Sequence, residues 1–282
     1  MRPLVAFLVS GVLCLVTATA HSQSPNKYTE LLYPSGGLRI QAYLYKPDGD
    51  GPFPVVIYNH GSRVGRERDS LPFEYIGALL SHARYTVLVP ERRGYGRSDG
   101  LTWPEAVGND KRRFVARLQE ETDDVLAAVD YLRTLPFVDP KRIGIMGWSF
   151  GGIVTMFAVS RSTTFVVAIN QAGAALTWNG NAQVRSALIA AAEKVTTPTL
   201  LLVAENDRTT ASITTLGEIF KKRGVTHQIV IYGPFLPQPQ TFASGAPGHQ
   251  LFSAQGVNVW QGDVLEFLSR YLGGVHPPKS QR

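Results

Sequence analysis

The chain has 282 residues, 44% of them hydrophobic, which is long and apolar enough to bury a sizeable core. Its formal net charge is +6, but it has no arginine-rich tail and no basic run interleaved with aromatic residues, so no nucleic-acid partner is expected. The only cysteine, Cys14, lies in an N-terminal apolar stretch. A mature chain without that stretch has no disulfide, no thiolate zinc site and no cysteine nucleophile.

The first 20 residues have the pattern of a secretory signal peptide. Arg2 precedes an apolar stretch at residues 4–16, and Ala18 and Ala20 have the spacing of a signal peptidase site. We therefore expect cleavage after Ala20, a mature chain that begins at His21, and a secreted or periplasmic protein with no stable membrane association. An uncleaved membrane anchor is the alternative, although the stretch is short against the roughly 20 residues of a bilayer span.

The elements predicted after this segment begin with a hairpin and continue as alternating strands and helices. Extended segments at residues 28–33 and 38–45 flank a Pro-Ser-Gly-Gly turn, which is typical of an antiparallel hairpin. Further strands are predicted at residues 55–58, 85–89, 143–146, 165–170, 199–204 and 228–232. Helices are predicted at residues 71–83, 121–132, from 151 onward, 184–192, 212–223 and 257–271. This alternation indicates an α/β fold with a mostly parallel sheet of about eight strands and helices on both faces.

The chain shows no internal repeat and no second domain. We expect an N-terminal segment at residues 21–27, one α/β domain at residues 28–272 and a disordered tail at residues 273–282. Fewer than thirty residues separate the strand that ends at residue 170 from the next, which leaves no room for a large lid. An insertion at residues 101–119 is the one segment that could act as a partial cover.

A candidate nucleophile lies between a predicted strand and a predicted helix. Residues 147–151 read Gly-Trp-Ser-Phe-Gly and fit the G-x-S-x-G nucleophile elbow in the strand–turn–helix context that this motif requires. Gly147 and Gly151 remove the Cβ atoms that would collide in so tight a turn. Ser149 would then sit at a helix N-terminus, which favours negative charge. A glycine-rich turn with an incidental serine is the alternative.

A serine nucleophile needs a base, and the base needs an acid that orients it. Asp207 follows the strand at residues 199–204, and His249 lies between the last strand and the last helix. The chain order Ser, Asp, His is the one that the elbow motif predicts, and the carboxyl ends of parallel strands share one sheet edge. Glu205 is the alternative acid, and ordinary loop roles are the alternatives for Asp207 and His249.

With these residues in order, the chain resembles the α/β-hydrolase superfamily over residues 28–272. Within it, the elbow looks like those of dienelactone-hydrolase-like proteins and of the prolyl oligopeptidase catalytic domain, and residues 92–98 look like an arginine–glycine turn found in many members. Dienelactone hydrolases proper use a cysteine nucleophile, so their lactone activity is not implied. Prolyl oligopeptidases carry a propeller domain, for which the residues before the elbow are too few.

The resemblance also implies an oxyanion hole made of two backbone N–H groups. Phe150 would supply the first, and Ser62, which follows a predicted strand, would supply the second, with Arg63 as the alternative. His60 is interpreted as a residue that shapes this loop rather than a catalyst. Six arginines after two strands could recognise a substrate carboxylate or pair with nearby acids: Arg63, Arg66, Arg68, Arg92, Arg93 and Arg97.

The sequence therefore predicts a serine hydrolase, in the first place a carboxylic ester hydrolase that works through an acyl-enzyme without a metal or cofactor. Its ligand would be a small ester or amide. A peptidase or amidase acting on small substrates is the main alternative, and acyl transfer to an acceptor other than water is another. A non-catalytic binding protein on the same fold would be expected to have a broken triad, which this chain does not show.

Overall fold

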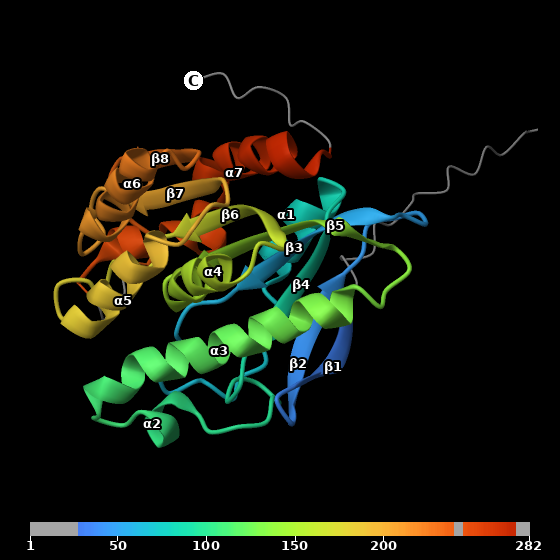
Figure 1. Cartoon of the computed structure of the whole chain (residues 1–282), viewed down its shortest axis with the longest axis horizontal. Helices are drawn as coiled ribbons and strands as arrows, with labels where there is room; N and C mark the ends of the chain where they lie inside the picture. Colours follow the sequence, from blue (N-terminus) through green and yellow to red (C-terminus); the bar gives the residue numbers. More distant parts are fainter. Residues whose placement is uncertain (1–27, 240–244, 275–282) are drawn as a thin grey trace, which may run out of the picture.

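An eight-stranded sheet runs through the computed structural model, which describes residues 28–239 and 245–274 (Figure 1). Its strands are β1 (Thr29–Ser35), β2 (Leu38–Tyr45), β3 (Phe53–Asn59), β4 (Thr86–Glu91), β5 (Val138–Trp148), β6 (Phe165–Gln171), β7 (Thr199–Ala204) and β8 (His227–Tyr232). Their order is β1-β2-β4-β3-β5-β6-β7-β8. The pairs β1–β2 and β2–β4 are antiparallel and the other five pairs are parallel, so the predicted fold with its N-terminal hairpin is confirmed.

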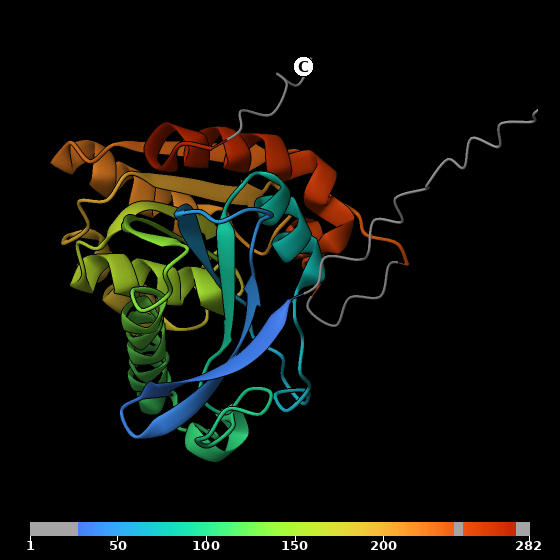
Figure 2. The ribbon, with the colours of Figure 1, turned by 90° about the vertical axis from the view of Figure 1, so that its right-hand side faces the viewer.

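Helices cover both faces of the sheet. The helices are α1 (Glu74–His82), α2 (Trp103–Ala106), α3 (Lys111–Leu132), α4 (Phe150–Arg161), α5 (Ala182–Ala192), α6 (Ala211–Arg223) and α7 (Val257–Leu272), with short 3₁₀ helices η1 (Pro247–Phe252) and η2 (Ala254–Gly256). Figure 2 shows α1 and α7 on one side of the strands and α3 and α4 on the other. Helix α5 packs between α4 and α6, and the connection from β6 to β7 holds no large lid.

The central strands are the most deeply buried part of the molecule. Every residue of β3, β4 and β7 is buried, whereas every residue of the edge strand β8 is at least partly exposed. Strands covered on both faces need continuous apolar runs, which explains why they were readable from the sequence. None of the helices formed by residues 28–239 and 245–274 is both long and apolar enough to cross a bilayer.

Helix α3 differs most from its prediction, because it begins at Lys111 rather than at residue 121. Asp110 caps it by accepting a hydrogen bond from the Arg112 N–H at 3.0 Å. Leu118 and Phe114 continue its apolar face about one and two turns before the predicted start, behind the basic run at its N-terminus. The second half of the 101–119 insertion is therefore helical.

The predicted signal peptide at residues 1–20 and the segment 21–27 lie outside the described residues, as does nearly all of the predicted tail at residues 273–282. These assignments stay predictions. Within the described part of the chain, β3, β5 and β7 run parallel, so residues just after Asn59, Trp148 and Ala204 meet at one edge of the sheet.

Candidate active site

Ser149 stands at a strained turn between β5 and α4. Its backbone has φ 59° and ψ −116°, which a non-glycine residue rarely adopts, and its N–H donates to the carbonyl oxygen of Gln171 at 2.9 Å. A Cβ atom on Gly151 would lie 1.8 Å from the carbonyl oxygen of Asn59, and one on Gly147 would lie 2.2 Å from the Gly151 carbonyl oxygen. Both glycines are therefore required for the tight approach of strand and helix.

The structure brings the three predicted side chains into one hydrogen-bonded chain. The Nε2 atom of His249 lies 2.9 Å from Oγ of Ser149, and its Nδ1 atom lies 2.8 Å from Oδ2 of Asp207. His249 and Asp207 are buried at 4% and 8% exposure, which strengthens their interaction. Because Nδ1 faces a carboxylate, it carries the ring proton, and Nε2 is left free to accept the hydroxyl proton.

His249 lies on η1, a short 3₁₀ helix between the last strand and the last long helix. Its carbonyl oxygen accepts a hydrogen bond from Nε1 of Trp148 at 3.1 Å, so the residue before Ser149 helps to hold it. On the side of the acid, Asn206, which precedes Asp207, exchanges two hydrogen bonds with the backbone of Phe235 and so holds this turn in place. Glu205, the alternative acid, is exposed, and no hydrogen bond or ion pair joins it to the histidine in the described part of the chain.

The loop after β3 lies against the nucleophile. A Cβ atom built on Gly61 would be 3.1 Å from Cβ and 3.8 Å from Oγ of Ser149. Within the described residues, the backbone N–H groups of Ser62 and Phe150 donate to no other protein group. Two unpaired amides therefore flank the serine, one from this loop and one from the N-terminus of α4.

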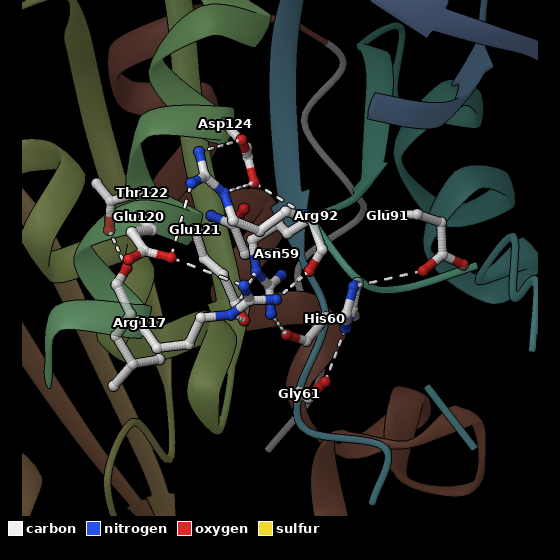
Figure 3. A network of polar contacts seen from close by, with 12 residues as sticks. Asn59, His60, Gly61, Glu91, Arg92, Arg117, Glu120, Glu121, Thr122 and Asp124 are labelled. Carbon is white, nitrogen blue, oxygen red and sulfur yellow. Dashed lines mark hydrogen bonds and ion pairs between the residues drawn. The ribbon is translucent and has the colours of Figure 1, made fainter. Parts of the chain in front are cut away.

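The His60 ring lies between Gly61 of this loop and Glu91 (Figure 3). Its Nδ1 atom donates to the Gly61 carbonyl oxygen at 2.7 Å, and its Nε2 atom lies 3.5 Å from Oε2 of Glu91. Burial and the guanidinium groups of Arg92 and Arg63 hold the pKa of His60 well below its usual range. The ring is therefore neutral.

The six arginines near the site are held by protein groups. Arg63, Arg66, Arg92, Arg93 and Arg97 pair with Glu91, Asp69, Glu121, Asp124 and Glu30, and Arg68 donates to the carbonyl oxygens of Ser98 and Gly100. This arrangement supports the loop-holding role rather than recognition of a substrate carboxylate. Sequence reasoning missed the roles of Glu121 and Asp124, although both lie on the buried face of a long helix beside the sheet.

Two aromatic side chains from the 101–119 insertion pack on Phe150, the residue that follows the serine. The ring centroid of Trp103 lies 4.9 Å from that of Phe114 and 5.0 Å from that of Phe150, and the two phenylalanine rings are 5.3 Å apart. Since Phe150 follows Ser149 directly, the insertion provides an apolar wall beside the nucleophile.

The sheet, the elbow and the order of the site residues are those of an α/β hydrolase. The chain belongs to the dienelactone hydrolase family, whose sequence model matches residues 40–235. The matched range includes Ser149 and Asp207, and His249 follows it.

Comparison with known proteins gives a consistent picture of the fold. The quorum-quenching protein AidA of Acinetobacter baumannii is 25% identical over 147 residues, which are 52% of this chain and 44% of AidA. Among solved structures, the acylaminoacyl peptidase of Pyrococcus horikoshii matches with a TM-score of 0.68 at 19% identity, over 92% of this chain and 44% of its own. The Pyrococcus furiosus esterase Pf2001 matches with a TM-score of 0.63 at 17% identity, over 88% of this chain and 91% of its own. The two structural matches establish the shared fold.

Proposed function

We propose that the protein is a serine hydrolase that cleaves carboxylic esters through an acyl-enzyme, with Ser149 as nucleophile, His249 as base and Asp207 as its orienting acid. The observation that carries the proposal is the continuous chain of hydrogen bonds, 2.8 Å from Asp207 to His249 and 2.9 Å from His249 to Ser149. This geometry is the one that serine activation requires.

In the proposed reaction, Oγ of Ser149 attacks the ester carbonyl carbon while Nε2 of His249 takes the hydroxyl proton. The negatively charged Asp207 stabilises the imidazolium ion that forms. The carbonyl oxygen becomes an oxyanion, which accepts hydrogen bonds from the backbone N–H groups of Phe150 and Ser62. His249 then returns the proton to the departing alkoxide, which leaves as the alcohol. Water repeats the sequence on the acyl-enzyme and releases the carboxylic acid.

The aromatic wall of Trp103, Phe114 and Phe150 supports a substrate with an apolar group on one side of the scissile bond. No arginine of the six near the site is left without a protein partner in the described residues, so a neutral ester fits better than an anionic one. The proposed class is therefore a small neutral ester.

The test is hydrolysis of p-nitrophenyl acetate, butyrate and octanoate by the wild type, by Ser149→Ala and by Ser160→Ala. Ser160 is the matched control because it lies on α4, the helix that Ser149 precedes, and among the described residues its hydroxyl bonds only to the Phe157 carbonyl oxygen. We expect Ser149→Ala to lose at least about a thousandfold in kcat, because the nucleophile is gone, and Ser160→Ala to match the wild type. Equal rates in wild type and Ser149→Ala would contradict the proposal.

Amide hydrolysis is the second candidate, favoured by the fold shared with the acylaminoacyl peptidase. The same three side chains would act, with His249 protonating an amine instead of an alkoxide. The ester reaction is preferred because no second domain covers the serine within residues 28–239 and 245–274. Matched p-nitroanilide substrates separate the two: turnover of the anilide at a rate near that of the ester would favour the peptidase.

We also propose that residues 1–20 are a signal peptide and that the protein acts outside the cytoplasm after cleavage behind Ala20. The basic residue, apolar stretch and small-residue exit in the sequence support this. N-terminal sequencing of the protein recovered from its native compartment tests it, with His21 as the expected first residue.

A further inference from the structure

A buried carboxylate, Glu121 of α3, joins three side chains behind the site, two of which, Arg92 and Arg117, are seen beside it in Figure 3. It accepts hydrogen bonds from Nε of Arg92 at 2.7 Å, from Nε1 of Trp103 at 2.6 Å and from Nε of Arg117 at 3.4 Å. Glu121 and Arg92 are fully buried, and Trp103 and Arg117 are exposed at only 7% and 4%. Water therefore contributes little to holding these groups.

The two shorter bonds lead to the two sides of the nucleophile. Nη2 of Arg92 donates to the carbonyl oxygen of His60 at 2.9 Å, two residues before Ser62. The Trp103 ring packs on Phe150, at a centroid distance of 5.0 Å. Glu121 thus connects to the loop after β3 through one partner and to the start of α4 through the other.

Stability alone does not account for this arrangement. Nη1 of Arg92 is buried and has no hydrogen-bond partner among the described residues, which costs free energy. A buried ion pair is in general no more stabilising than well-packed apolar side chains of similar volume. The Arg92–Glu121 pair is better explained by the position in which it holds the backbone of the loop after β3, at the carbonyl oxygen of His60.

We propose that Glu121 is a positioning residue that, through Arg92 and Trp103, sets the spacing of the Ser62 and Phe150 amides so that both reach the oxyanion of the transition state. This inference rests on the proposed serine hydrolase function. It differs from a purely structural role because it predicts a loss in the chemical step, with ground-state binding little changed.

Asp124 provides a matched control on the same helix. It is equally buried and pairs with Arg93, the neighbour of Arg92, at 2.8 Å. Its other contacts lead away from the site, because Oδ1 accepts from Oγ of Ser35 at 2.7 Å and its carbonyl oxygen accepts from the Tyr33 hydroxyl. Asp124→Asn therefore disturbs a similar ion pair without touching the oxyanion loop.

The experiment measures kcat and KM for p-nitrophenyl acetate, together with inhibition by phenylboronic acid, which forms a tetrahedral adduct with a nucleophilic serine. The variants are Glu121→Gln, Arg92→Lys and Asp124→Asn, with Ser149→Ala as the reference for the proposed function. Arg92→Lys keeps the charge beside Glu121 but loses the planar guanidinium group, which donates to Glu121 and to the His60 carbonyl oxygen at once. It provides a second test if Glu121→Gln does not fold.

We expect Glu121→Gln and Arg92→Lys to lower kcat roughly ten- to a hundredfold while KM changes by less than about threefold. The inhibition constant of the boronic acid should rise in parallel with the loss in kcat. Asp124→Asn should keep kcat within about twofold of the wild type, even if its melting temperature falls as far as that of Glu121→Gln.

A folded Glu121→Gln or Arg92→Lys protein with kcat within about twofold of the wild type would overturn the inference. So would an equal loss of kcat in Asp124→Asn, because the effect would then come from loosening α3. If the wild type shows no turnover that depends on Ser149, the proposed function fails and this inference fails with it.

Discussion

Replacing Asp207 by asparagine is expected to reverse the tautomer of His249. Oδ1 of Asp207 accepts the backbone N–H of Arg208 at 2.7 Å, and Oδ2 faces Nδ1 of His249 at 2.8 Å. In Asp207→Asn the amide oxygen must stay with the backbone N–H, so the new NH₂ group faces Nδ1. Nδ1 then has to accept a hydrogen bond, and the ring proton moves to Nε2, 2.9 Å from Oγ of Ser149.

With its proton on Nε2, His249 cannot take the serine proton. The corresponding change in a serine protease triad lowers kcat about 10⁴-fold, which is about 5.4 kcal/mol of lost transition-state stabilisation. We expect a loss of this order in Asp207→Asn, measured as initial rates with p-nitrophenyl butyrate, because Nε2 of His249, which faces Oγ of Ser149 at 2.9 Å, then carries the ring proton. The fold should persist, since the shape of the side chain is unchanged.

Asp69→Asn is the matched control, because Asp69 is an exposed carboxylate whose only ion-pair partner in the described part of the chain is Arg66. Its kcat should equal that of the wild type. A loss of less than about tenfold in a folded Asp207→Asn protein, or the same loss in the control, would refute the tautomer argument.

The remaining predictions concern the packing and the buried histidine beside the serine. Gly151→Ala places a Cβ atom 1.8 Å from the Asn59 carbonyl oxygen and should lower the free energy of unfolding by more than about 3 kcal/mol. In the control Gly180→Ala the new Cβ meets nothing within 4 Å, so the free energy of unfolding should change little. Equal denaturation midpoints for the two variants would contradict this prediction. Burial lowers the pKa of His60 in the folded state, so below about pH 6.5 the unfolded chain takes up a proton that the folded one excludes, and stability falls by up to about 1.4 kcal/mol per pH unit. The unfolding free energy of His60→Asn, measured by denaturant titration over the same pH range, should fall less steeply, and parallel curves for variant and wild type would exclude this linkage.

The fold was predictable because its signals are local. Strands such as β3 and β7 are continuous buried runs, and the elbow around Ser149 combines a strand end, two glycines and a helix start within a few residues. Asp207 and His249 could be proposed from chain order, since each follows a strand of the sheet. The hydrogen bonds among the three side chains then follow from the shared sheet edge.

The support of the site could not be predicted in the same way. The pairs Arg92–Glu121 and Arg93–Asp124 join residues some thirty positions apart, and the sequence shows several acids nearer to each arginine. The acid that pairs with each arginine is determined by how α3 packs on the sheet. That position was obscured because the basic residues at the start of α3 hid its first apolar turns.

The central claim is that Ser149 carries the acyl group during turnover. The most direct measurement is mass spectrometry of the protein after acid quenching during turnover of p-nitrophenyl acetate, followed by peptide mapping. The account predicts one added acetyl group, located on Ser149 and absent from Ser149→Ala. An acetyl group on another residue that appears and decays at the rate of turnover would contradict it.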